Sequence, residues 1–230
     1  MTAPSDSIQI APPAVLPDWA ARAVNLADAR LGAEALACSD DFFAPAARLL
    51  DPRPARFVPD KYDDHGKWMD GWETRRKRIA GHDWCIVKLG CAGAIRGFDF
   101  DTSFFTGNYP PAVSVEGCPA GGDPEGKDWR ALTPTLALQG GRHHLIEAPG
   151  AGDALWSHLR VNIFPDGGLA RLRVYGRPAA QVAEAGPDGL VDLAAARHGG
   201  RALAWNDAHY GAAANLLLPG RGVNMGDGWE

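Results

Sequence analysis

The sequence lacks the features that define several large protein classes. No apolar run approaches the roughly 18 residues that a membrane-spanning helix needs. The first 17 residues have neither the basic start nor the apolar centre of a signal peptide. The His-x-x-His and His-Glu-x-x-His spacings, the Gly-x-Gly-x-x-Gly fingerprint, the P-loop and the Gly-x-Ser-x-Gly elbow are all missing. Motif-defined zinc hydrolases, nucleotide-binding proteins and serine hydrolases are therefore not indicated.

Positive charge and paired cysteines are also scarce. With 23 basic and 28 acidic residues, the net charge is −5, which argues against binding to nucleic acid or to an anionic membrane. The longest basic run, Arg75–Arg78, is more typical of a solvated face. Four cysteines stand at positions 38, 85, 91 and 118, and none forms a Cys-x-x-Cys pair. We therefore expect reduced thiols in a cytoplasmic protein.

Glycine and proline, in contrast, are abundant. The 28 glycines and 18 prolines make up a fifth of the 230 residues, which favours short elements joined by tight turns. Runs typical of strands lie at 84–89, 95–100, 112–116, 136–138, 144–147, 158–164 and 169–175. Pro165–Gly168, between the last two runs, predicts a hairpin. An all-β fold of the sandwich or jelly-roll type follows, because no long helices separate the strands.

One helix is expected near the N-terminus. Ala20, Val24, Ala27 and Leu31 recur at helical spacing after Asp18, a candidate N-cap, and Gly32 would end the helix.

An internal repeat is the most informative feature of the sequence. Ala35-Leu36-Ala37 recurs as Ala202-Leu203-Ala204, and the same offset of 167 positions aligns Asp40 with Asp207 and residues 46–50 with 213–217. Asp70-Gly71-Trp72-Glu73 recurs as Asp227-Gly228-Trp229-Glu230, at an offset of 157. Two matched blocks in the same order indicate a duplicated domain.

The repeat also suggests domain boundaries. We expect an N-terminal extension over 1–31, a first domain over 32–178, a linker over 179–199 and the start of a second domain over 200–230. The first copy continues for about a hundred residues past its Asp-Gly-Trp-Glu box, whereas the second stops there. The chain is thus expected to end inside its second domain. Residues 200–230 are expected to pack loosely or to lie along the first domain, because so short a segment does not fold alone.

Several long motifs carry a family resemblance. They are Gly66–Arg76, Gly97–Pro111, Asn162–Gly168, Arg171–Gly176 and Leu218–Glu230. The chain closely resembles the allantoicases, which hydrolyse allantoate to ureidoglycolate and urea in purine catabolism. The resemblance implies two related jelly-roll β-sandwich domains of the galactose-binding-like type, in agreement with the repeat.

The reaction requires a clamp for a carboxylate, a base for water and a proton for the leaving nitrogen. Arginine suits the clamp, and we expect Arg75 or Arg96 in this role. Asp99 or Asp101 is the expected base, because the two share a strand face opposite Phe98 and Phe100.

Three further residues belong to the expected site. His82 is the expected acid, and Glu73 and Asn108 complete the predicted site. Each prediction has a structural alternative: Arg96 could pair with an aspartate, Glu73 with Arg75, and the duplicated box could serve the fold alone.

No cofactor is predicted, although a divalent metal stays open. The expected partner is allantoate, with neither nucleic acid nor membrane, and a homo-oligomer is expected at full length. A non-catalytic ligand-binding β-sandwich and an inactive allantoicase remnant are the competing interpretations. Release of urea from allantoate would separate the enzyme from both.

Overall fold

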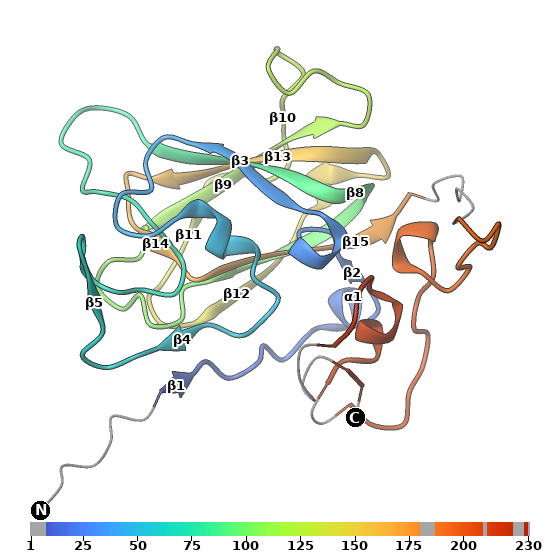
Figure 1. The fold of residues 1–230 in the computed structure, drawn as a ribbon. Helices are drawn as coiled ribbons and strands as arrows, with labels where there is room; N and C mark the ends of the chain where they lie inside the picture. Colours follow the sequence, from blue (N-terminus) through green and yellow to red (C-terminus); the bar gives the residue numbers. More distant parts are fainter. Residues whose placement is uncertain (1–7, 180–186, 209–210, 223–227, 230) are drawn as a thin grey trace, which may run out of the picture.

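The longest strand, β8 (Asp83–Asp101), organises the molecule. The computed structural model describes residues 8–179, 187–208, 211–222 and 228–229. The first half of β8 pairs with β3 (Glu34–Cys38) and β13 (Leu155–Phe164), and its second half pairs with β12 (His143–Glu147) and β15 (Arg171–Pro178). Because β8 bends between these halves, it contributes to both layers of a β-sandwich (Figure 1). The all-β, jelly-roll prediction is confirmed.

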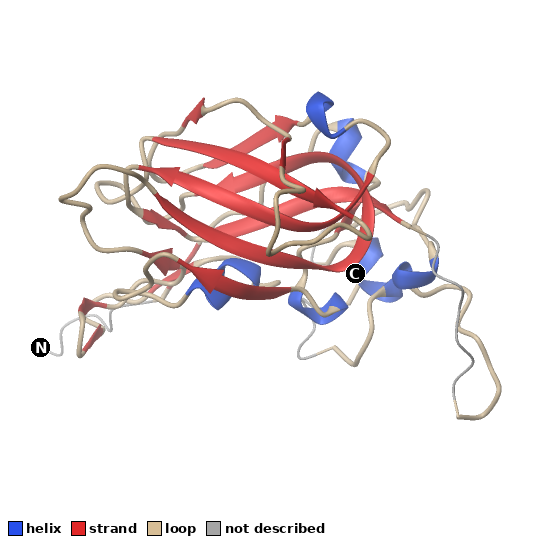
Figure 2. Ribbon diagram, turned by 90° about the horizontal axis from the view of Figure 1, so that it is seen from above, coloured by secondary structure: helices blue, strands red, loops and turns tan. Residues whose placement is uncertain are grey.

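The remaining strands extend this sheet or pair at its ends. The order along the sheet is β10-β9-β13-β8-β15-β2, with β11 on β9. The long strand β9 (Ala112–Pro119) belongs to this sheet. Short elements lie around the long strands (Figure 2). They are β1 (Gln9–Ile10), α1 (Asp18–Ala21), β2 (Val24–Asn25), η1 (Ala29–Leu31), η2 (Ala46–Leu50), β4 (Arg56–Phe57), β5 (Tyr62–Asp63), β6 (Gly66–Lys67), β7 (Trp72–Glu73), β10 (Arg130–Ala131), β11 (Leu136–Ala137), η3 (Pro149–Ala151), β14 (Gly168–Leu169), η4 (Ala196–His198) and η5 (Ala213–Leu217), where η denotes a 3₁₀ helix.

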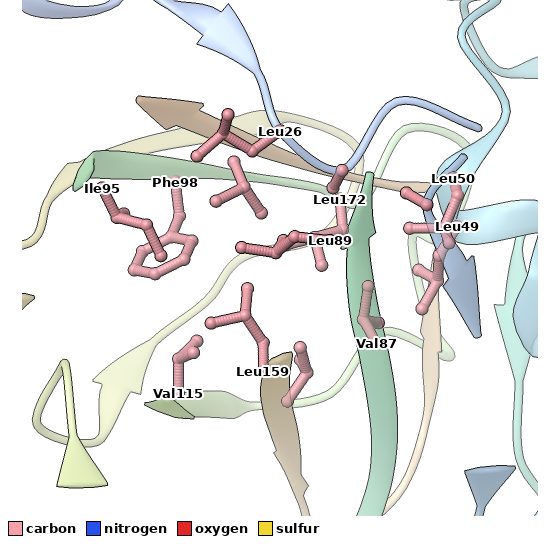
Figure 3. Packing of buried hydrophobic residues seen from close by; sticks show 14 of the residues in the cluster. Leu26, Leu49, Leu50, Val87, Leu89, Ile95, Phe98, Val115, Leu159 and Leu172 are labelled. Atoms are coloured by element: carbon pink, nitrogen blue, oxygen red, sulfur yellow. The ribbon is translucent and has the colours of Figure 1, made fainter. Parts of the chain in front are cut away.

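The core lies between the two layers. Alternate residues of β8 point inward, and leucines from the segments around it fill the space between them, as Figure 3 shows for Val87, Leu89, Phe98, Leu159 and Leu172. Each fully buried side chain of this kind stabilises the fold by about 1.5–3 kcal/mol. All four cysteines are free thiols, so in this structure packing holds the sandwich together without disulfides. None of the described helices is long and apolar enough to cross a membrane.

The predicted helix over 18–31 is wrong beyond its first turn. Only Asp18–Ala21 is α-helical, whereas Val24–Asn25 forms β2 and Ala29–Leu31 a 3₁₀ turn that ends at Gly32 with φ +96°. The backbone of Leu26 donates to the carbonyl of Val174, and the Asn25 side chain accepts from the Val174 N–H. The edge of the sheet therefore takes the hydrogen bonds that a helix would have made.

The two strands predicted at 84–89 and 95–100 are one strand. Gly90 does not end it, because there the backbone of β8 packs directly on η1: a Cβ on Gly90 would lie 2.8 Å from the Leu31 carbonyl carbon. The glycine thus permits a close approach of two segments and makes no turn.

The hairpin predicted at Pro165–Gly168 is also wrong. The strands that flank it, β13 and β15, both pair with β8 and not with each other. The chain does reverse direction at these turn residues. Because β8 lies between β13 and β15, the connection passes from one layer of the sandwich to the other and does not join two paired strands. Gly168–Leu169 pairs instead with Trp72–Glu73 of β7.

The repeat is visible in the local structure. The 3₁₀ helix η2 (Ala46–Leu50) and its counterpart η5 (Ala213–Leu217) occupy matching positions at the offset of 167. The indole N–H of Trp72 donates to the Asp40 carbonyl at 2.8 Å, and that of Trp229 donates to the Asp207 carbonyl at 2.6 Å. The second copy therefore matches the first at these two points, although residues 201–205 do not form the strand that Glu34–Cys38 forms in the first copy.

Residues 201–229 lie against the first copy where they are described. Leu217 and Leu218 pack on the core cluster, whereas Leu203 and Leu216 are exposed. Within the second box, Gly228 and Trp229 are described, and Asp227 and Glu230 lie outside the described residues. The predicted domain boundaries stay predictions.

Candidate active site

Asp99 and Asp101 lie on one face of β8, under the N-terminal segment. The Nδ1 of His143 on the neighbouring β12 is 2.7 Å from an Asp99 oxygen and 4.0 Å from an Asp101 oxygen. Phe98 and Phe100 face the core on the other side. Both carboxylates are almost fully buried, and each also accepts a backbone N–H, from His144 and Ser103 respectively. These contacts tie both carboxylates to β12 and to the turn after β8. A catalytic role for either stays a prediction.

His143 is held in its charged form by these contacts. Its Nδ1 faces Asp99 and its Nε2 faces the Pro12 carbonyl at 3.2 Å, so both nitrogens meet acceptors. Burial lowers the pKa of His143, but the Asp99 hydrogen bond and the charges of Asp99 and Asp101 outweigh it and raise the pKa to about 9. The imidazolium thus fastens the N-terminal segment to the sheet.

This ion pair predicts a pH-dependent stability. Because the pKa of folded His143 is raised above its ordinary value of 6.5 to about 9, the stabilisation is complete below pH 6.5 and is lost as pH rises towards 9, a loss of up to about 3 kcal/mol. Urea denaturation at pH 6 and pH 9.5 measures it. We expect His143→Gln to remove most of this difference, while His65→Gln, at an exposed position, leaves it intact. An unchanged difference in His143→Gln contradicts the assignment.

Asp70 of the duplicated box belongs to a buried ion pair. The guanidinium of Arg171, opposite Asp101 in the β15–β8 register, donates to the Asp70 carboxylate and to its backbone carbonyl, both at 2.8 Å. The same guanidinium donates to the Arg53 carbonyl at 2.9 Å. These bonds fasten both the segment before β7 and the loop before β4 to the sheet, and the Asp70 carboxylate also accepts the Arg56 backbone N–H at 2.9 Å. Asp70 therefore has a structural role.

The remaining predicted residues are distributed over three places. The Asn108 amide donates to Glu73 at 2.7 Å, and burial raises the pKa of Glu73 while this bond opposes the rise. Arg75 donates to Asp40 and so does not pair with Glu73. Arg96 lies 3.6 Å from Asp153 on the surface. No contact among the described residues joins Glu73, Arg75 or Arg96 to Asp99, so the structure does not bring the predicted set together.

His82 lies in a different setting, at the edge of a cavity of about 710 Å³. The cavity lies on the outer face of the layer in which β9, β13 and the first half of β8 are neighbours. His82 Nε2 is 3.3 Å from the Asn162 side-chain oxygen, and its ring packs on Phe164. The other polar lining residues are Ser114, Glu116, Thr133, Thr135 and Arg160.

The cavity follows from strand register. Arg160 of β13 lies between Glu116 of β9 and Ile86 of β8, and Asn162 lies between Ser114 and Trp84. Since successive strand residues alternate between faces, these side chains gather on one surface while Leu159, Val161 and Ile163 enter the core. A cavity of this volume suits a small ligand.

Apart from His82, none of the polar residues that line this cavity was predicted as a site residue. Glu116, Arg160 and Asn162 each alternate with apolar residues in the runs 112–116 and 158–164. The alternation itself was a signal, because it places a carboxylate, a guanidinium and an amide on the same outward face. Among the described residues, no group of three or more His, Cys, Asp and Glu side chains is arranged to hold a metal ion.

Comparisons with known proteins agree on one family. The family model described as "Allantoicase repeat" matches residues 24–179 and 191–230. The chain is 59% identical to probable allantoicase 1 of Burkholderia mallei, over 93% of the chain and 64% of that protein. It is 54% identical to the probable allantoicase of Acinetobacter baylyi, over 96% of the chain and 65% of that protein.

A solved structure shows the same fold. The allantoicase of Saccharomyces cerevisiae superposes with a TM-score of 0.75 at 35% identity, covering 90% of this chain and 63% of that one. This chain therefore spans slightly less than two thirds of the length of these relatives.

Proposed function

Because the chain belongs to the allantoicase family, we propose that it hydrolyses allantoate to ureidoglycolate and urea in cytoplasmic purine catabolism. The observation that carries the proposal is the identity of 54–59% to probable allantoicases across nearly the whole chain. The matched part includes the cavity on the sheet face and both copies of the repeat.

The chemistry of the reaction fits the residue types that the sandwich presents. Allantoate has a carboxylate and two ureido groups on one carbon. Hydrolysis breaks the bond from that carbon to one ureido nitrogen, forms a bond to the water oxygen, and moves one proton from water to the departing nitrogen. A guanidinium binds the carboxylate in fork geometry, and a carboxylate or imidazole serves the proton transfer.

The proposal is tested by incubating the purified 230-residue chain with allantoate and measuring urea. We expect urea and ureidoglycolate to appear in equal amounts at a rate proportional to protein concentration. Binding of allantoate without release of urea contradicts hydrolysis by this chain and favours a ligand-binding module. Heat-denatured protein provides the blank.

A second expectation concerns cofactors. No cofactor is predicted for the reaction and a divalent metal is left open, so dialysis against a chelator is the deciding experiment; we expect it to change the rate of urea release by less than about twofold. Loss of activity that returns with a divalent metal would show that the chemistry depends on one.

A further inference from the structure

The cavity on the outer face of β8, β13 and β9 has the composition of an anion site with an adjacent base. We propose that it holds allantoate, with Arg160 as the clamp for the substrate carboxylate and Glu116 as the base that activates water. This inference rests on the proposed function and names the site at which that function would occur.

The guanidinium of Arg160 is the first observation. It is 3.6 Å from the nearer Glu116 oxygen, which is beyond hydrogen-bond distance, and it packs 4.5 Å above the Trp129 ring. Within the described part of the chain its N–H groups donate no hydrogen bond, whereas Arg171 donates to a carboxylate and several carbonyls. Arg160 therefore pairs with Glu116 through charge alone, and its N–H groups stay available for an anion beside the cavity, as a clamp requires.

The orientation of Glu116 is the second observation. One of its oxygens accepts from the Asn162 amide at 3.2 Å. An ionised carboxylate only accepts hydrogen bonds. The amide NH2 group of Asn162 must therefore face Glu116, and the amide oxygen must face His82. His82 Nε2, at 3.3 Å from that oxygen, then donates the bond. The chain His82–Asn162–Glu116 holds the carboxylate at the cavity wall, with Glu116 about one-third exposed.

The remaining walls fit the substrate. Trp84 and Ile86 of β8 supply an apolar floor, and Ser114 and Thr133 supply small polar groups able to bond a ureido group. Glu116 takes a proton from water as the oxygen bonds to the central carbon, and passes it to the ureido nitrogen as the carbon–nitrogen bond breaks. The products are ureidoglycolate and urea, and the step balances without a co-reactant.

Two variants of the 230-residue chain test the assignment, with binding of allantoate followed by calorimetry and turnover by urea release. We expect Arg160→Gln to weaken binding of allantoate about 10- to 100-fold, and to change binding of the neutral amide of allantoate by less than about threefold. Glu116→Gln should bind allantoate within about threefold of the unaltered chain and lose at least about 100-fold in urea release. Arg142→Gln is the matched control, since Arg142 bonds Gln139 outside this cavity.

The possible outcomes distinguish an error in the assigned site from an error in the proposed hydrolysis. Urea release that persists unchanged in both variants leaves the proposed function intact and overturns the site. Binding that depends on Arg160 without any urea release supports the site and contradicts hydrolysis by this chain. Failure of the unaltered chain to bind allantoate overturns both. Circular dichroism of each variant shows whether the fold is retained, and Arg160→Lys, which keeps the charge and loses the fork, should give an intermediate affinity if the site is correct.

Discussion

Replacing Arg171 by methionine should destabilise the fold by about 3–5 kcal/mol, because it removes the buried guanidinium that pairs with the Asp70 carboxylate and leaves the more exposed Arg56, at 3.4 Å, as its charged partner. The Arg171 side chain is 1% exposed and that of Asp70 is 5% exposed. The guanidinium also donates to the carbonyls of Arg53 and Ala170, so the substitution removes further hydrogen bonds besides the ion pair. Chemical denaturation of the variant measures the loss in the free energy of unfolding.

The matched control is an exposed arginine–aspartate pair. Arg75 binds Asp40 at 2.7 Å, but its side chain is 63% exposed. We expect Arg75→Met to cost less than about 1 kcal/mol, as is usual for surface pairs. Equal losses for the two variants would show that burial does not set the strength of the Asp70 pair.

The two tryptophans of the repeated box should differ in their contribution to stability. Trp72 is fully buried and Trp229 is 41% exposed, although both donate the same hydrogen bond to a backbone carbonyl. Trp72→Ala should cost about 3–5 kcal/mol because it opens a cavity in the core. Trp229→Ala, measured by the same denaturation experiment, should cost less than about 1 kcal/mol. A large loss from Trp229→Ala would mean that this indole is buried in solution.

The sequence predicted the fold class well because alternation and turn residues are local signals. The runs at 112–116, 144–147 and 158–164 all form strands. The errors arose where tertiary contacts decide. Val24 has helical spacing with Ala20 and Ala27, yet Val24 and Asn25 pair with Gly176 and Tyr175 at the edge of the sheet. Gly90 has the character of a turn residue, and only its contact with Leu31 explains why the strand continues.

The duplicated box illustrates what repetition can and cannot reveal. Asp70 binds Arg171, a Cβ on Gly71 would collide with the Leu169 backbone, and Trp72 fills the core. Three of its four residues thus have structural duties, in accord with the interpretation that duplication serves the fold. Glu73 differs, since it bonds Asn108 outside the core.

The candidate site was harder to predict because its residues come from strands that are distant in sequence. Ser114 and Asn162 become neighbours only through the β9–β13 register, which no local pattern encodes. The prediction for His82 rests on its closeness to the box in sequence, whereas its contacts in the structure are with Asn162 and Phe164. Arg160 and Glu116 had no signal beyond their alternation with core residues.

The position of bound substrate tests the central claim most directly. A crystal structure of Glu116→Gln with allantoate should show the ligand carboxylate at about 2.7–2.9 Å from the Arg160 guanidinium, and the central carbon facing residue 116. Allantoate bound instead beside Asp99 and Asp101, or beside Glu73 and Asn108, would contradict the account and return the catalytic role to those residues.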